Sequence, residues 1–221
     1  MTRVFADALL LDLDGTLVDS TASVLRNWAR IAAMLGREGE DIHGGRHGVP
    51  GRQVLRTIEP GLSEERIREL DRALHEGEIS DTRDVTATKG ALPLVEALPS
   101  DRWAIVTSGS RRLALARLGA AGLPVPAVMV TADDVRNGKP DPAPYRLAAR
   151  HLGWPTERCL AIEDAPAGIT AARAAGCHTL GVLTTFTALD ATTVADLSAV
   201  AVEVTADGLI ITYPSSEASS S

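Results

Sequence analysis

Short apolar runs alternate with segments of helical periodicity over most of the chain. The runs lie at residues 8–11, 103–106, 127–130, 159–162 and 179–183. Between them, segments such as 113–118 and 169–175 repeat their apolar residues at helical spacing. Strands that alternate with helices predict a parallel sheet covered by helices on both faces, which is an α/β fold.

The segment from residue 18 to residue 88 breaks this alternation, because its apolar residues recur only at helical spacing. One predicted helix ends at Gly36 and buries the face that holds Val24, Trp28, Ile31 and Leu35. A second begins after Ser63, ends near Gly77 and buries Ile67, Leu70 and Leu74. We therefore predict a discontinuous core, residues 1–17 and 89–221, and a helical insertion, residues 18–88, that covers one edge of the sheet.

Composition and charge exclude several classes of partner. With 45% hydrophobic and 23% charged residues, the 221-residue chain is ordinary for a globular protein. Its net charge of −7 opposes binding to nucleic acid or to acidic membranes. No apolar run approaches the roughly 18 residues of a membrane span and no secretion signal is present, so we expect a cytoplasmic protein. Cys159 and Cys177 are expected to be buried small residues, neither disulfide-bonded nor metal-bound.

Acidic pairs follow two of the predicted strands: Asp12 with Asp14, and Glu163 with Asp164. Ligands of parallel α/β sheets bind beyond the carboxyl ends of the strands, where these side chains would emerge. Lys139 adds a cation, and one cation among several carboxylates suits phosphoryl transfer. Two alternatives remain: an Asx-type turn that ends a strand at Asp12, and a solvated lysine on the surface.

Four motifs in this order resemble the haloacid dehalogenase superfamily, and in particular its phosphatases with an α-helical cap inserted after the first strand. The motifs are Asp12-Leu13-Asp14-Gly15-Thr16, Thr107-Ser108-Gly109, Lys139 and Glu163-Asp164. The resemblance implies a Rossmann-like catalytic core, a cap formed by residues 18–88 and the activity of a phosphoric monoester hydrolase.

The resemblance also implies the catalytic roles. Asp12 attacks phosphorus and forms an aspartyl phosphate. Asp14 protonates the leaving alcohol and then deprotonates the water that hydrolyses the intermediate. Lys139 neutralises charge on the nucleophile and on the phosphoryl oxygens.

Further residues are expected to hold the phosphoryl group and a metal ion. Ser108, or Thr107 in its place, binds the phosphoryl group with the amide of Gly109, and Thr16 also faces the substrate. The alternative for Thr107 is a hydroxyl that only caps its strand. The implied cofactor is Mg²⁺, with its expected ligands being Asp12, the backbone carbonyl of Asp14, Asp164 and, through a water molecule, Glu163.

The expected substrate is a small phosphorylated metabolite that the cap selects. Residues 43–52 are rich in glycine and cations, and we select His47 and Arg52 as candidate substrate ligands, with an ordinary mobile basic loop as the alternative. Residues 103–109 and 163–169 resemble the glycerol-phosphate and sugar-phosphate phosphatase branch, which implies a phosphorylated polyol or hexose. We expect a monomer or a weak homodimer.

Three other functions remain as alternatives. A β-phosphoglucomutase would carry a histidine on the first cap helix, where this chain has Val24. A receiver-type signalling module would place its acceptor aspartate on an inner strand of a much shorter chain. A catalytically idle binding protein would lack catalytic residues, whereas every such position is filled here.

Overall fold

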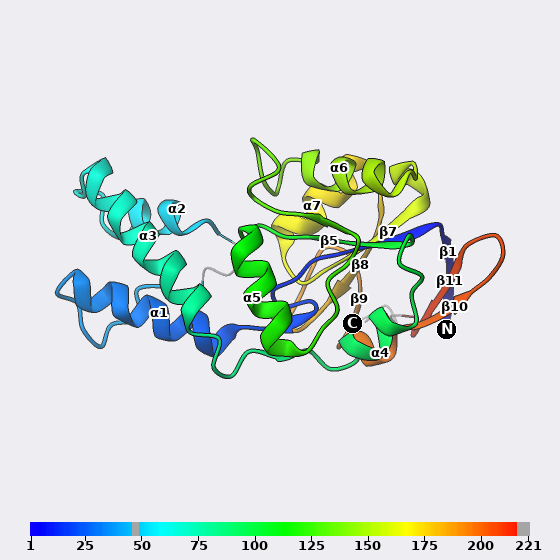
Figure 1. Ribbon diagram of the computed structural model, residues 1–221, viewed down its shortest axis with the longest axis horizontal. Helices are drawn as coiled ribbons and strands as arrows, with labels where there is room; N and C mark the ends of the chain where they lie inside the picture. Colours follow the sequence, from blue (N-terminus) through cyan, green and yellow to red (C-terminus); the bar gives the residue numbers. More distant parts are fainter. Residues whose placement is uncertain (46–48, 216–221) are drawn as a thin grey trace, which may run out of the picture.

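The computed structural model describes residues 1–45 and 49–215. At its centre lies a parallel sheet of six strands: β2 (Ala8–Leu11), β5 (Trp103–Val106), β6 (Val128–Val130), β7 (Cys159–Glu163), β8 (His178–Val182) and β9 (Thr192–Val194). Their order is β6-β5-β2-β7-β8-β9, so β2 and β7 are central neighbours. Figure 1 labels β5, β7, β8 and β9 within the core. The predicted parallel-sheet fold is confirmed, and each predicted apolar run forms one of these strands.

Both faces of the sheet are buried, because the strands are apolar on both sides. In β2, Leu9 and Leu11 face one hydrophobic cluster, and Ala8 and Leu10 face another. Helices α6 (Ala143–Leu152) and α7 (Pro166–Ala175) cover the second cluster. Helices α4 (Ala91–Glu96) and α5 (Arg111–Ala121) cover the first. This burial on both faces is typical of parallel sheets.

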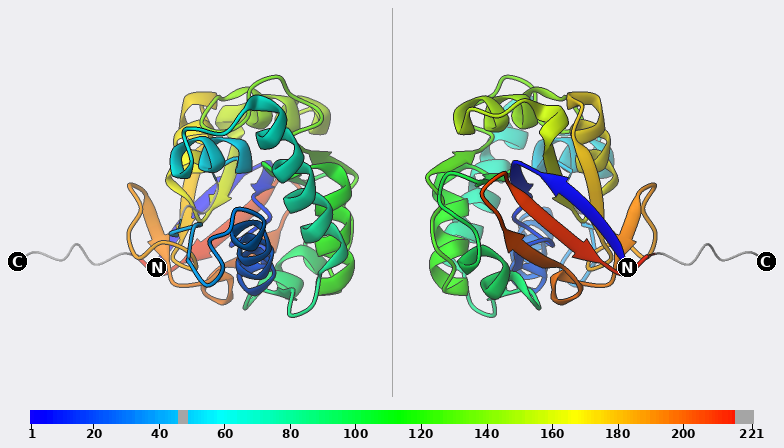
Figure 2. Two further views of the ribbon diagram at one scale, coloured as in Figure 1. Left: turned by 90° about the vertical axis from the view of Figure 1, so that its left-hand side faces the viewer. Right: turned by 90° about the vertical axis from the view of Figure 1, so that its right-hand side faces the viewer.

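A second sheet, which the sequence did not predict, extends the first cluster. It is antiparallel, with the order β1-β11-β10, and consists of β1 (Thr2–Ala6), β11 (Leu209–Tyr213) and β10 (Ala201–Val204) (Figure 2, right). Two 3₁₀ turns, η1 (Thr156–Arg158) and η2 (Leu197–Ala199), complete the core. In β11 the buried residues alternate with the half-buried Ile210 and Thr212. Because Ile210 is apolar, the sequence does not show the alternation of apolar and polar residues that predicts a strand.

The helical insertion has a hydrophobic cluster of its own. It consists of α1 (Thr21–Met34), α2 (Gly51–Ile58) and α3 (Glu64–Ser80), which lie beside the core (Figure 1; Figure 2, left). Two short antiparallel strands, β3 (Val18–Asp19) and β4 (Thr86–Ala87), pair where the chain leaves and re-enters the core. The boundaries 18–88 stay a prediction, and these five elements all fall within them.

The apolar faces predicted for the insertion pack into its cluster, although Val24 and Leu35 are only half-buried. The last helix is longer than expected. Trp28 and Leu70 are both part of the cluster, and the Ser63 side chain caps α3 by accepting a hydrogen bond from Arg66 N. The predicted end near Gly77 is wrong, because α3 continues to Ser80. A Cβ atom at residue 77 would overlap the side chain of Asn27 on α1, so the glycine allows close helix packing.

Two further expectations concern apolar segments and thiols. Cys159 and Cys177 are both buried, as predicted, and both are free thiols in the structure. Among the described residues, no helix combines the length and the apolar character that crossing a membrane requires.

We predict that Leu70→Ala lowers the free energy of unfolding by about 2 to 5 kcal/mol, because Leu70 is 0% exposed in the insertion's cluster. The matched control is Leu25→Ala on α1, where the side chain is 44% exposed and a change within about 0.5 kcal/mol is expected. Urea unfolding followed by circular dichroism measures both. Equal effects of the two substitutions would contradict the packing described here.

Candidate active site

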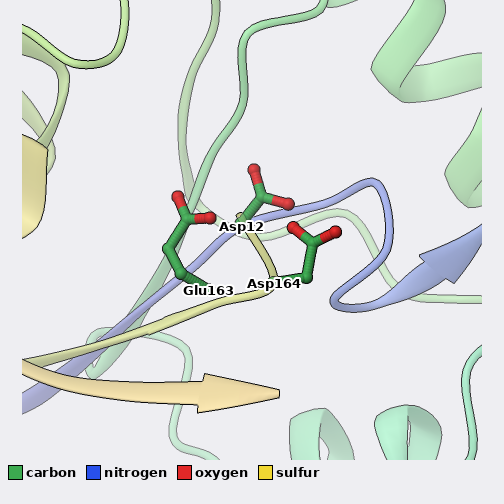
Figure 3. A group of neighbouring side chains, drawn as sticks. All are labelled: Asp12, Glu163 and Asp164. Atoms are coloured by element: carbon green, nitrogen blue, oxygen red, sulfur yellow. The ribbon is translucent and has the colours of Figure 1, made fainter. Parts of the chain in front are cut away.

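Three acidic side chains gather at the carboxyl ends of β2 and β7. Because the two strands are parallel neighbours, with Leu11 paired to Ile162, the residues that follow them lie side by side. The Asp12 amide donates to the Ile162 carbonyl at 3.0 Å and extends this pairing. Carboxylate oxygens of three side chains then lie within 4.8 Å of one another (Figure 3): Asp12, Glu163 and Asp164.

Lys139 brings a positive charge to this cluster. Its Nζ lies 2.5 Å from Asp12 Oδ1 and 2.5 Å from Glu163 Oε1. It also donates to the Val106 carbonyl at the end of β5, at 2.8 Å. Burial opposes the ammonium charge, but the two carboxylates outweigh it and raise the pKa of Lys139. Lys139 is therefore a buried, charged partner of Asp12, which excludes a solvated surface lysine.

The cluster carries more negative charge than Lys139 can balance. Burial raises the pKa of Asp12 well above its ordinary value; Lys139 lowers it, and repulsion from Glu163 and Asp164 raises it further. Burial and Glu163 likewise raise the pKa of Asp164 to about 7. When all three carboxyl groups are ionised, one ammonium leaves two excess negative charges. Buried oxygen ligands with this excess charge fit a divalent cation such as Mg²⁺.

Two further residues, one on α6 and one on α7, shape the surroundings of Glu163. The Tyr145 hydroxyl on α6 donates a hydrogen bond to Glu163 Oε1. Burial raises the pKa of Tyr145, so this phenol stays protonated and remains a donor. On α7, a Cβ atom at Gly168 would overlap the Glu163 carboxylate. Only glycine leaves room for that side chain at this position.

The segment after β5 offers candidate ligands for a phosphoryl group. Thr107 is buried, and its Oγ1 accepts a hydrogen bond from Gly109 N at 3.0 Å. Ser108 is exposed and lines the same cavity. All three residues line the cavity. The amide of Gly109 is used within the loop, the Thr107 hydroxyl keeps its own proton to donate, and Ser108 is the most exposed of the three.

Asp14 is held by two side chains, one on each carboxylate oxygen. Ser20 Oγ donates to Oδ1 at 2.8 Å. Arg117 Nη1, from α5, lies 2.6 Å from Oδ2. Arg117 was not predicted as a site residue. Its position on the buried face of α5, beside Leu113 and Leu118, was the available signal, because a charge on an apolar helix face requires a partner.

The insertion closes one side of a cavity of about 540 Å³ that contains these residues. Arg52 on α2 lines it, and Arg52 Nε lies 2.6 Å from Asp71 Oδ2 on α3. His47, the other predicted cap ligand, lies outside the described residues. Thr16 is fully buried rather than part of the cavity wall, and its hydroxyl has no hydrogen-bond partner within residues 1–45 and 49–215.

Residues 6–176 match the family model of the haloacid dehalogenase-like hydrolases. The chain is 43% identical over 175 residues to hexitol phosphatase A of Escherichia coli strain K12. This alignment covers 78% of this chain and 81% of that protein. Glycerol-1-phosphate phosphohydrolase 2 of Saccharomyces cerevisiae is 30% identical over 189 residues, covering 81% and 76%. The crystal structure of a hydrolase from Pseudomonas syringae matches with a TM-score of 0.71 at 28% identity, covering 81% and 86%.

These matches agree with the motifs and with the fold. The match to the family description extends over most of the chain, from the strand before Asp12 to the helix after Asp164. The expected enzyme class, a phosphoric monoester hydrolase, agrees with relatives that are named phosphatases. The chain therefore belongs to the haloacid dehalogenase-like hydrolase family.

Proposed function

We propose that this enzyme hydrolyses a small phosphorylated polyol or sugar through an aspartyl phosphate on Asp12, with Mg²⁺ as cofactor. The observation that carries the proposal is the contact of Lys139 with both Asp12 and Glu163 in a buried cluster of three carboxylates. An anionic phosphoryl group can approach such a cluster only where positive charge balances it. The family and its named phosphatases support the same chemistry.

In the first step, a carboxylate oxygen of Asp12 attacks phosphorus, and the bond from phosphorus to the leaving oxygen breaks. Asp14 gives its proton to that oxygen, so the product leaves as a neutral alcohol. Lys139, beside Asp12 Oδ1, balances charge on the nucleophile and on the transferring group. Ser108, exposed in the cavity, donates a hydrogen bond to a phosphoryl oxygen.

In the second step, water attacks the phosphorus of the aspartyl phosphate. Asp14 takes a proton from this water, and the bond from phosphorus to the Asp12 oxygen breaks. Inorganic phosphate and the Asp12 carboxylate are regenerated. Asp14 thus returns to the protonated state in which it began the cycle, so that the two steps balance.

The residues that would hold Mg²⁺ are Asp12, Asp164, the backbone carbonyl of Asp14 and, through a water molecule, Glu163. When bound, the ion supplies the positive charge that the three carboxylates lack. Within the protein, the Tyr145 hydroxyl directs Glu163 toward Lys139 and keeps this carboxylate in a fixed orientation.

A polyol or sugar leaving group fits the insertion side of the cavity. The Arg52–Asp71 pair offers both donors and acceptors of hydrogen bonds, as a chain of hydroxyl groups requires. The named relatives act on hexitol and glycerol phosphates. Val24, where a mutase would carry histidine, lines the cavity with an apolar side chain that cannot transfer a proton, which favours hydrolysis over phosphotransfer to a sugar. The cytoplasmic location and the monomeric or weakly dimeric state stay predictions.

Replacing Asp12 by asparagine tests the nucleophile. We expect Asp12→Asn to lower the turnover of p-nitrophenyl phosphate on the order of 10⁴-fold or more, because an amide cannot form the acyl phosphate. The matched control is Asp190→Asn, a fully exposed aspartate, which should leave turnover unchanged. Circular dichroism checks that both variants are folded. Substantial turnover by the folded Asp12→Asn variant would contradict the covalent mechanism.

Cation binding is expected to strengthen as the pH rises from 6 to 8. The folded protein holds a proton on Asp164 up to a pKa of about 7, whereas the unfolded chain releases it near 3.8. Without cation, this carboxyl group therefore contributes stability that falls as the pH rises between these values. A cation must displace the proton, so Mg²⁺ should raise Tm more at pH 8 than at pH 6.

Thermal unfolding with MgCl₂ and with EDTA at the two pH values measures this difference, and the Asp164→Asn variant should reduce it. Phosphate release should also disappear in EDTA and return with Mg²⁺. An equal shift of Tm at both pH values, or activity that is indifferent to EDTA, would contradict the cation site.

Arg52 is expected to bind the leaving group and so to contribute to substrate selection. Arg52→Ala should raise KM for glycerol phosphate or a hexitol phosphate by about tenfold and change KM for p-nitrophenyl phosphate less, because a lost hydrogen bond to a charged group costs about 1.5 kcal/mol. The control is Arg56→Ala on the same helix, whose side chain pairs with Glu64 instead. Equal increases of KM for both esters would show that Arg52 does not select the substrate.

A further inference from the structure

Arg117 is a buried cation without a role in the four motifs. It lies on the core-facing side of α5, and its side chain is only 5% exposed. An arginine side chain keeps its charge in proteins, and burying an unpaired charge costs several kcal/mol. Its place in the fold therefore depends on the anionic groups around it.

The guanidinium contacts two carboxylates from different parts of the chain. Nη1 lies 2.6 Å from Asp14 Oδ2, in the loop after β2. Nη2 lies 3.5 Å from Glu78 Oε2, near the end of α3 in the helical insertion. The Glu78 side chain is 13% exposed, and burial raises its pKa to about 7. One side chain of the core thus connects the insertion to Asp14.

Together with Ser20, Arg117 fixes the direction of the Asp14 carboxylate. Ser20 Oγ holds Oδ1 and Arg117 holds Oδ2, so neither oxygen is free to turn without breaking a contact. An acid that must deliver a proton to one leaving oxygen depends on such orientation, and a displacement of 1 Å can cost about 10²-fold in rate.

We propose that Arg117 is the positioning residue for Asp14, and that Glu78 of the insertion holds Arg117 in place. The inference rests on the proposed acid/base role of Asp14. It assigns the insertion a part in catalysis besides substrate selection, because Glu78 completes the support of Asp14 only where α3 packs against α5. The Arg112–Glu76 ion pair, at 2.8 Å, joins the same two helices without contacting Asp14.

The test compares two esters that differ in their need for a proton donor. An alkyl ester such as glycerol phosphate releases an alkoxide that must be protonated, whereas p-nitrophenolate leaves without a proton. The ratio kcat/KM reports the steps up to departure of the leaving group, so a defect in Asp14 should affect the alkyl ester selectively. A purely structural defect would lower both values together.

Arg117→Met should lower kcat/KM about 100-fold for glycerol phosphate and less than about fivefold for p-nitrophenyl phosphate. Arg117→Lys should recover glycerol phosphate hydrolysis to within about tenfold of the wild type. Glu78→Gln should lower kcat/KM by a smaller factor with the same selectivity for glycerol phosphate. This variant tests the inference if Arg117→Met does not fold. Arg112→Met is the matched control, which should show no selectivity between the esters, because Arg112 joins α3 and α5 without lining the cavity.

Asp14→Asn separates failure of the inference from failure of the proposed function. If Asp14→Asn is selective for the alkyl ester but Arg117→Met and Glu78→Gln are not, the inference alone is overturned. Equal increases of KM for both esters in Arg117→Met would make Arg117 a substrate ligand and would also overturn it. A wild type that releases phosphate from neither ester overturns the proposed function and the inference with it.

Discussion

The ammonium of Lys139 is the charge on which the active site depends. It lies 2.5 Å from Asp12 and 2.5 Å from Glu163, in a site where three carboxylates would otherwise repel one another. One positive charge is not enough to balance them. Burial, and after it repulsion among the carboxylates, raises the pKa values of Asp12 and Asp164. In the proposed mechanism, a divalent cation offsets the excess negative charge, and together with Lys139 it lets an anionic phosphoryl group approach.

The strand pairing of the core sets the positions of these charged residues. Parallel pairing of β2 with β7 brings Asp12 beside Glu163, and the end of β5 supplies the carbonyl that holds Lys139. Helix α6 covers the sheet and contributes the Tyr145 hydroxyl to Glu163. The insertion leaves the core shortly after Asp14, at β3, so its helices line the same cavity, and α3 contacts α5 (Figure 1).

Sequence periodicity predicted the central sheet and the insertion because buried strands and amphipathic helices leave strong local patterns. It missed β11, where Ile210 is apolar but faces outward, and it ended α3 too early because Gly77 serves helix packing. The motif residues Asp12, Lys139 and Asp164 come together as expected. Arg117 and Tyr145 carried no motif, because their partners lie on distant segments and only the folded chain reveals them.

The central claim is that the phosphoryl group passes through Asp12. Acid quenching of the enzyme during turnover, followed by reduction with sodium borohydride, converts an aspartyl phosphate to homoserine, which mass spectrometry of the peptides locates. The account predicts homoserine at residue 12 only when substrate is present. Homoserine at another position would contradict this claim. The absence of homoserine, in a sample that releases phosphate under conditions where the intermediate accumulates, would also contradict it.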